Sequence, residues 1–209
     1  MKYRSGENFT VLAVCTGNIC RSPALERLLR AEFADSDRIS VVSGGLGALV
    51  GEPVHPPMAD LLRRRGVDAD GFAAQQVTQE MVNSADLVLT ASRRQRSAVV
   101  EISPAAVRRT FTVRELARIA ANLEPRDLDE AAGGSPDPVQ RFAALVPLAA
   151  THRFEVDRNL DDVSDPYRRS PEAYAVAFTL IDEAVETITR VVRGEGARMA
   201  PEVVEATGR

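Results

Sequence analysis

The sequence has few of the residues that build disulfide frameworks or metal sites: it contains two cysteines and two histidines. Cys15 and Cys20 are five positions apart, whereas a structural disulfide normally closes a longer loop. With no histidine beside them in the sequence, the two thiols also make a poor metal site. We therefore expect neither a disulfide-stapled secreted fold nor a bound metal or other cofactor.

Long apolar runs and a strong charge imbalance are also missing. No stretch approaches the roughly 20 apolar residues that a membrane-spanning helix needs, and residues 1–9 lack the apolar run of a signal peptide. A formal net charge of −4 gives no overall attraction to nucleic acid or to an anionic membrane. These absences predict a cytoplasmic protein with no nucleic-acid partner and no membrane insertion.

The chain is long enough to bury a substantial core, because 44% of its 209 residues are hydrophobic. We expect a single domain over residues 1–193, containing an insertion at about 124–164 and followed by a polar C-terminal tail, 194–209. Residues 124–138 are rich in proline, glycine and acidic side chains and predict a long loop. The insertion either edges an active site or is a plain surface addition.

Apolar patterns predict alternating strands and helices. Residues 9–14 form a continuous apolar run, which is typical of a strand buried on both faces of a parallel sheet. The alternation predicts an α/β fold of three layers, with a parallel sheet flanked by helices. Further strands are expected at residues 39–42, 85–90 and 109–113, and helices at 22–33, 57–65, 93–100, 114–122 and 171–192.

The turn between the first strand and the first helix has the sequence VCTGNICRSP, residues 14–23. A turn in that place directs several backbone N–H groups into one concavity, with the positive end of the helix dipole behind it. That geometry binds a phosphate-sized dianion. Gly17 permits close backbone approach and Asn18 tolerates a left-handed conformation. A Walker A phosphate loop is excluded because the Gly-Lys-Ser/Thr sequence is missing.

The side chains of this turn suit phosphoryl transfer. The amides, the helix terminus and Arg21 all favour the thiolate of Cys15, which is the nucleophilic form. Arg21 can hold two phosphoryl oxygens, and Ser22 can donate a hydrogen bond to the sulfur. A cysteine at the end of a buried strand is usually a small apolar residue, but here the glycine, asparagine, serine and proline of the turn occur together. The sequence therefore predicts Cys15 as a nucleophile.

Residues 15–23, CTGNICRSP, resemble the signature of the bacterial low-molecular-weight protein tyrosine phosphatases. A second family landmark, an Asp-Pro followed by an aromatic residue before the last helix, is matched by Asp165, Pro166 and Tyr167. The resemblance implies that Asp165 is the general acid and then the base, that Tyr167 walls the substrate pocket, and that a cysteinyl-phosphate forms on Cys15 without a metal. It also implies a four-stranded sheet in the order 2-1-3-4, Rossmann-like or flavodoxin-like. It assigns phosphate binding to Thr16, Gly17, Asn18, Ile19, Cys20, Arg21 and Ser22.

The chain departs from the family pattern around this turn. At the end of the second strand, Ser-Gly-Gly-Leu replaces the usual Ser-Ala-Gly-Thr, and its Ser43 is expected to hydrogen-bond Asn18 and to border the substrate pocket. Phe72 and Gln75 stand where the family often has histidine and arginine, and Ser92 stands where it has aspartate. These replacements predict an altered support network, with weaker activity or an unusual substrate.

Three functions remain open on the sequence. The favoured one is hydrolysis of phosphomonoesters, with protein phosphotyrosine or a small phosphoester as the substrate. Arsenate reduction on the same fold would need a small-thiol relay, since no cysteine follows Cys20. The third is a phosphate-binding regulatory module with little activity. Cys20 is either a small buried residue or the partner of Cys15 in a reversible disulfide that protects the nucleophile from oxidation.

Other charged and imidazole side chains receive no site role. The arginines at 63–65 and at 93, 94 and 96 are expected to lie on solvated helix faces. His55 and His152 are isolated. The sequence gives no indication of the oligomeric state.

Overall fold

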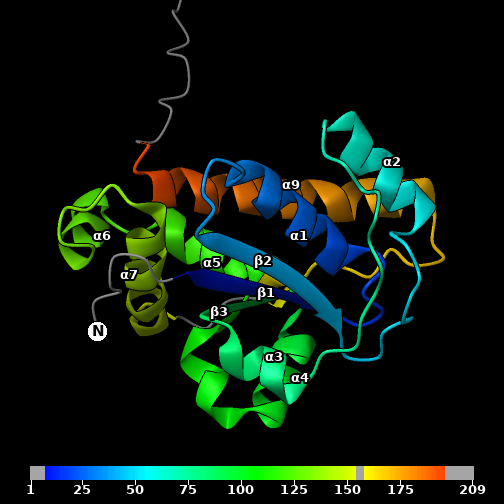
Figure 1. Ribbon diagram of the computed structural model, residues 1–209, viewed down its shortest axis with the longest axis horizontal. Coiled ribbons are helices and arrows are strands. Elements are labelled where there is room, and N and C mark those ends of the chain that lie inside the picture. The colour runs from blue at the N-terminus through cyan, green and yellow to red at the C-terminus, as the bar shows by residue number, and fades with distance from the viewer. Residues whose placement is uncertain (1–7, 154–157, 196–209) are drawn as a thin grey trace, which may run out of the picture.

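Four parallel strands form the centre of the fold (Figure 1). The computed structural model describes residues 8–153 and 158–195. The strand order is β2-β1-β3-β4, so the predicted α/β class and the predicted order are both confirmed. The strands are β1 (Phe9–Cys15), β2 (Ile39–Gly45), β3 (Leu87–Thr90) and β4 (Thr110–Thr112).

Strand β1 lies inside the sheet and is covered on both faces. Val11 and Ala13 belong to one hydrophobic cluster, whereas Leu12 and Val14 belong to a second cluster on the opposite face. All four side chains are at most 1% exposed. The strand is continuously apolar because neither of its faces meets water.

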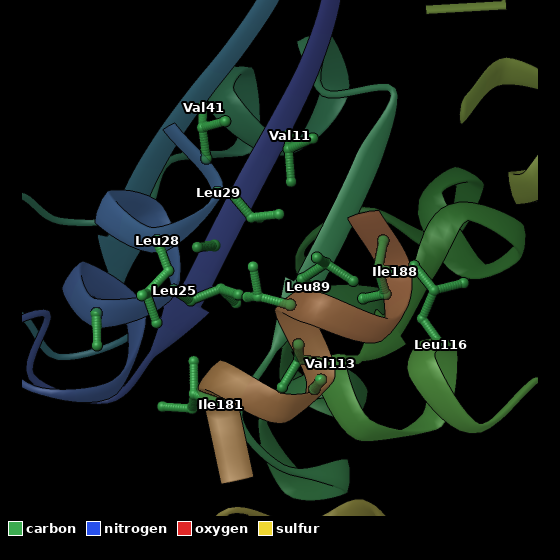
Figure 2. Packing of buried hydrophobic residues seen from close by; sticks show 14 of the residues in the cluster. Val11, Leu25, Leu28, Leu29, Val41, Leu89, Val113, Leu116, Ile181 and Ile188 are labelled. Atoms are coloured by element: carbon green, nitrogen blue, oxygen red, sulfur yellow. The ribbon is translucent and has the colours of Figure 1, made fainter. Parts of the chain in front are cut away.

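The larger cluster lies between the sheet and a layer of helices that includes α1, α5 and α9 (Figure 1). Helix α9 packs along both α1 and α5. Figure 2 shows Leu25 and Leu28 of α1 and Ile181 of α9 gathered against the sheet, with Leu116 of α5 beside Ile188 of α9. The bounds are α1 (Arg21–Glu32), α5 (Val113–Ala121) and α9 (Pro171–Arg193), and α2 (Pro56–Arg64) packs against α1 and α9.

The opposite face is covered by three short elements, seen below the sheet in Figure 1. Val82, Val99 and Ala106, one from each element, pack against Leu12 and Val14 of β1. Thr78 and Ser92 accept hydrogen bonds from backbone amides at the starts of two of these helices. The elements are α3 (Gln79–Ser84), α4 (Arg93–Ile102) and the 3₁₀ helix η1 (Pro104–Arg109).

The predicted long loop at residues 124–138 is wrong in part, because the segment contains α6 (Pro125–Ala131) and leads directly into α7 (Pro138–Thr151). Its prolines start helices instead of excluding them, since proline suits the first turn of a helix. Phe142 of α7 is 1% exposed and stacks on Phe9 of β1 with ring centroids 5.1 Å apart. The insertion therefore contributes to the core as well as to the surface.

Helix α8 (Arg158–Asp161) ends the insertion. Gly194 and Glu195 are the part of the predicted tail that lies within the described residues, and Gly194 ends α9 with a left-handed φ of 71°. Residues 1–7 and 196–209 of the predicted domain and tail lie outside them. Across residues 8–153 and 158–195, we find no helix with the length and apolar character needed to cross a membrane.

Among the arginines predicted to lie on solvated helix faces, Arg65, Arg93 and Arg96 pair with carboxylates of other helices. Arg65 contacts Asp182 of α9 at 3.1 Å and thereby ties the end of α2 to α9. Arg96 pairs at 2.7 Å with Glu115, which is 4% exposed. The pattern of three basic residues was read as solvated because their acidic partners are far away in the sequence.

Candidate active site

The conspicuous turn lies at the carboxyl edge of the sheet. Cys15 is the last residue of β1, and Arg21 is the first residue of α1. Strand β1 has β2 on one side and β3 on the other, so the strand added after β2 lies on the opposite side of β1. Ligands of open α/β sheets bind at such a switch point, beyond the carboxyl ends of the strands.

A neighbouring segment, residues 46–55, anchors the outside of the turn. Its amides bind four successive or nearly successive carbonyls of the turn. Because the C=O and N–H of a peptide plane point in opposite directions, this anchoring turns amides of the loop toward its inner side. The hydrogen bonds are Leu46 N to Cys15 O (3.0 Å), Gly47 N to Thr16 O (3.0 Å), Leu49 N to Gly17 O (3.0 Å) and His55 N to Ile19 O (2.8 Å).

Asn18 holds the turn in shape from within. Its φ of 54° is left-handed, as predicted, and its side chain is fully buried. The Nδ2 amine donates to Ser22 Oγ and to Ser43 Oγ, both at 2.9 Å, while Oδ1 accepts from Gln75 N at 2.8 Å. The predicted bond between Ser43 and Asn18 is confirmed. The assignment of Ser43 to the substrate pocket is wrong, because Ser43 is 0% exposed and lies beneath the turn.

Two donors point at the sulfur of Cys15. Asn18 N lies 3.3 Å from Sγ, and Ser22 Oγ lies 3.0 Å from it. Because Ser22 Oγ already accepts from Asn18 Nδ2, its own hydrogen is free to point to the sulfur. Both contacts are directed at the atom that is predicted to act as the nucleophile.

Two glycines explain one departure from the family pattern. A Cβ on Gly44 would lie 2.7 Å from Val77 Cγ2, so this chain cannot place the family's usual alanine there without moving Val77. A Cβ on Gly45 would lie 2.5 Å from Thr16 O, inside the anchored turn. Gly45 is therefore needed for the close approach of β2 to the phosphate loop.

Two further departures, Gln75 and Ser92, make hydrogen bonds close to the turn. Gln75 supplies its backbone amide to Asn18 and donates from Nε2 to Ser43 O at 2.9 Å. Ser92 accepts from Gln95 N at 3.4 Å as the N-cap of α4. Gln95 in turn donates from Nε2 to Thr16 Oγ1 at 3.1 Å. Gln75 and Gln95 thus hydrogen-bond residues in and beside the turn, and weaker activity or an unusual substrate stays a prediction.

Arg21 and Asp165 meet beside the turn. Arg21 is 5% exposed, and its Nη2 lies 2.7 Å from Asp165 Oδ2. Its Nη1 donates to Val163 O at 3.1 Å, whereas its buried Nε–H has no hydrogen-bond partner among the described residues. Asp165 is half exposed, and its Oδ1 accepts from Tyr167 N at 3.2 Å. The structure thus brings together two residues that are 144 positions apart in the sequence, and leaves a buried donor that a phosphoryl oxygen could use.

A cavity of about 280 Å³ adjoins the turn. Tyr167 forms part of its wall, and the rings of Tyr167 and His55 lie nearly perpendicular at a centroid distance of 5.3 Å. His55 Nδ1 lies 3.0 Å from Tyr174 Oη, so this histidine, which the sequence left without a role, braces the proposed pocket wall. The cavity is lined by Ile19, Leu49, Glu52, Pro53, His55, Pro56 and Tyr167.

The second cysteine differs from the first in its environment. Burial raises the pKa of the Cys20 thiol to about 12, with further contributions from the charges of Cys15 and Asp165. Tyr174, which hydrogen-bonds Cys20, has its own pKa raised to about 12 by burial and by Cys20. Cys20 therefore stays protonated at neutral pH, and its part in a protective disulfide remains a prediction, since thiol exchange requires a thiolate.

Selective alkylation tests this difference. The thiolate fraction of Cys20 rises only as the pH approaches about 12, so iodoacetamide at pH 7 is expected to label Cys15 and to leave Cys20 unlabelled. Peptide mass mapping after partial reaction measures both sites. The variant Cys20→Ala should label at the wild-type rate. Labelling of Cys20 as fast as Cys15 would contradict the assignment.

Within the described residues, no group of three histidine, cysteine, aspartate or glutamate side chains is placed to hold a metal ion. The sequence-predicted loop residues, Arg21, Asp165 and Tyr167 all lie at one edge of the sheet. The functional contacts that sequence reasoning missed are those of His55 and Gln95, since neither residue belongs to a recognisable motif.

Comparison with known proteins agrees with this geometry. A model of the family described as low molecular weight phosphotyrosine protein phosphatase matches residues 10–146. The chain is 38% identical over 185 residues to the low molecular weight protein-tyrosine-phosphatase Wzb of Salmonella typhi, covering 88% of this chain and 95% of that protein. It is 28% identical over 187 residues to the probable low molecular weight protein-tyrosine-phosphatase EpsP of Ralstonia nicotianae, covering 90% of this chain and 98% of that protein.

A solved structure shows the same fold. Vibrio vulnificus Wzb in complex with benzylphosphonate superposes with a TM-score of 0.60 at 26% identity, over 88% of this chain and 99% of that chain. The family model spans well over half of the 209 residues and includes the whole of the turn that begins at Cys15. The chain therefore belongs to the low molecular weight phosphotyrosine protein phosphatase family, and it is a phosphatase.

Proposed function

We propose that the protein hydrolyses phosphotyrosine in proteins, with Cys15 as the nucleophile and Asp165 as the general acid and base. The observation that carries this proposal is the pair of hydrogen bonds from Asn18 N and Ser22 Oγ to the Cys15 sulfur. The same turn carries the ion pair between Arg21 and Asp165. The proposed nucleophile Cys15, the guanidinium of Arg21 and the carboxyl group of Asp165 therefore lie at one site.

In the first step, the Cys15 thiolate attacks phosphorus. The S–P bond forms while the bond between phosphorus and the tyrosyl oxygen breaks, and Asp165 gives its proton to the departing oxygen. Arg21 and the loop amides bind the equatorial phosphoryl oxygens, whose charge changes in the transition state. Protonated Asp165 no longer attracts Arg21 as an ion does. The proton that prepares the acid therefore also releases Nη2 for a phosphoryl oxygen.

In the second step, water attacks the cysteinyl-phosphate. Asp165, now a carboxylate, accepts a proton from that water as the new P–O bond forms and the S–P bond breaks. Inorganic phosphate leaves, and the Cys15 thiolate is restored. The hydrogen bond from Ser22 stabilises the sulfur as it becomes the leaving group, so this bond serves both steps.

The substrate class follows from the cavity beside the turn. Tyr167 and Ile19 supply apolar wall, and an aromatic ring can stack on the Tyr167 ring. The related Vibrio enzyme is solved with benzylphosphonate, a phosphonate that carries a benzyl group. Both observations support a phosphate ester with an aromatic leaving group, such as phosphotyrosine.

Hydrolysis of three matched peptides tests the substrate. The peptides share one sequence and carry phosphotyrosine, phosphoserine or phosphoarginine, and the buffer contains EDTA. We expect the phosphotyrosine peptide to have the highest kcat/KM, by at least about tenfold, because only its ring fills the cavity. The variant Tyr167→Leu keeps an apolar wall without a ring and should narrow this preference. Equal rates on the three peptides, or a requirement for added metal, would contradict the proposal.

The proposal extends to the setting of the enzyme. A nucleophilic thiol needs a reducing compartment, which supports the cytoplasm as the location and a phosphotyrosine-containing protein or small phosphoester as the partner. Side chains of α7 and α9 share one cluster with those of β1, which supports a single catalytic domain across residues 8–193.

A further inference from the structure

Asp161, the last residue of α8, is a buried carboxylate outside the phosphate loop. Its side chain is 1% exposed and lies between two arginines. Arg93 donates to Oδ2 from Nη2 at 2.7 Å and from Nε at 3.1 Å. Arg118 donates to Oδ1 from Nη2 at 3.1 Å and from Nε at 3.3 Å. Each oxygen thus receives two charge-assisted hydrogen bonds, one pair from α4 and one from α5.

The backbone that follows Asp161 is also fixed, up to two positions before Asp165. Four parts of the fold contribute: the residue after β3 and the first turns of α4, α5 and α1. The general acid, Asp165, therefore follows a segment in which each residue from 161 to 163 is held by hydrogen bonds. The bonds are Arg93 N to Asp162 Oδ1 (2.7 Å), Arg114 Nη1 to Asp162 O (3.0 Å), Val163 N to Ala91 O (2.8 Å) and Arg21 Nη1 to Val163 O (3.1 Å).

Stability alone is a poor reason for this arrangement. Burying a carboxylate between two guanidiniums costs desolvation free energy, and an apolar contact of similar volume is often at least as stable. What such a cluster does provide is direction, because two planar guanidiniums accept a carboxylate in few orientations. Arg93 and Arg118 lie on α4 and α5, the helices that follow β3 and β4. The two guanidiniums therefore fix the orientation of the Asp161 carboxylate relative to the carboxyl edge of the sheet.

We propose that Asp161 is a positioning residue for the general acid: its contacts with Arg93 and Arg118 hold the segment that carries Asp165 beside Arg21. This inference rests on the proposed role of Asp165. Without the Asp161 charge, Arg93 and Arg118 lose the carboxylate that they both bind, and the segment loses its fixed point four residues before the acid. Proton donation then suffers, because a shift of about 1 Å in a reacting group can cost about 100-fold in rate.

The variant Asp161→Asn tests this role through the leaving group. Phenol leaves less readily than p-nitrophenol and needs the proton from Asp165 more. We expect kcat/KM of Asp161→Asn to fall by about tenfold or more for phenyl phosphate, and by no more than about threefold for p-nitrophenyl phosphate. In an Asp165→Asn background, Asp161→Asn should add no more than about a twofold loss on either substrate, because the group that it positions is gone.

Glu115→Gln is the matched control. Glu115 is also a buried carboxylate between two arginines, Arg96 and Arg153, but its hydrogen bonds go to Arg96 of α4 and to the backbone of Thr112 instead of to residues 161–163. Glutamine preserves its capping box with Thr112. We expect Glu115→Gln to change kcat/KM for the two substrates by the same factor. The proposal is wrong, and Asp161 is only structural, if Asp161→Asn also lowers both kcat/KM values by the same factor. It is equally wrong if the loss in the double variant equals the product of the losses in Asp161→Asn and Asp165→Asn.

Two further results keep the test decisive. Arg118→Ala removes one side of the contact while Arg93 still pairs with Asp161, so it should show the same substrate bias more weakly and serves if Asp161→Asn does not fold. The single variant Asp165→Asn separates the two proposals. If Asp165→Asn itself shows no leaving-group bias, the proposed function of Asp165 is wrong. If it shows the bias and folded Asp161 and Arg118 variants do not, the positioning role alone is wrong.

Discussion

Replacing Cys15 with serine is expected to lower kcat for p-nitrophenyl phosphate by at least about 10³-fold. The alcohol is a far weaker nucleophile than a thiolate, and the two hydrogen bonds that stabilise the sulfur cannot ionise an ordinary hydroxyl. Initial rates with excess substrate and EDTA measure the effect. Cys20→Ser, a change to the same residue type in the same loop, is the matched control and should keep most of the activity, because Cys20 stays protonated.

Loss of activity in Cys15→Ser must be separated from loss of folding. The amides and Arg21 remain in the variant, so inorganic phosphate should still raise its thermal unfolding temperature. A Cys15→Ser protein that keeps within a few-fold of the wild-type kcat would refute the nucleophile. A folded variant that no longer binds phosphate would show that the sulfur shapes the loop as well as reacting.

Replacing Asp165 with asparagine is expected to have the second-largest effect, and one that depends on the substrate. General acid catalysis contributes about 10² to 10⁴-fold, so kcat/KM for phenyl phosphate should fall by about 10²-fold or more. The loss for p-nitrophenyl phosphate should be about tenfold at most, since p-nitrophenolate leaves without much help. A plot of log kcat/KM against the pKa of the leaving phenol measures this difference as a slope.

The slope also distinguishes chemistry from binding. Asparagine removes the ion pair with Arg21 at 2.7 Å while keeping a polar side chain of the same size at the mouth of the site. If the ion pair serves only to hold Arg21 in place, Asp165→Asn should lower kcat/KM for all aryl phosphates by one common factor. Such a uniform loss would contradict the role of Asp165 as the acid.

The phosphate loop could be predicted from the sequence because its parts are contiguous. Residues 15–22 place the nucleophile, the amides and the guanidinium within one turn, and the apolar run before them fixes the end of a buried strand. The left-handed Asn18 was predicted from the turn itself and its bond to Ser43 from the family pattern, and the structure has both. Asp165 was assigned through the family resemblance, since Asp-Pro in isolation predicts only a turn.

The parts that the sequence could not predict depend on contacts between distant residues. Arg93 and Arg118 are 68 and 43 positions from Asp161, and nothing in an arginine run indicates which carboxylate will pair with it. In the sequence, Gly44 suggests a weaker contact because it lacks the methyl group of the family's alanine. In the structure, Val77 occupies the space of that methyl group. Helix α7 was missed because its proline was read as a loop residue, although Pro138 opens the helix and Phe142 fills the core.

The central claim is that the Cys15 sulfur carries the phosphoryl group between the two steps. The most direct measurement is rapid acid quenching of the enzyme during turnover of p-nitrophenyl phosphate, followed by mass analysis of the peptide that contains Cys15. We predict one added phosphoryl group on Cys15 and none on Cys20, and more of it when Asp165→Asn slows hydrolysis of the intermediate. Turnover at the full rate with no phosphoryl group on Cys15 at any quench time would contradict the account.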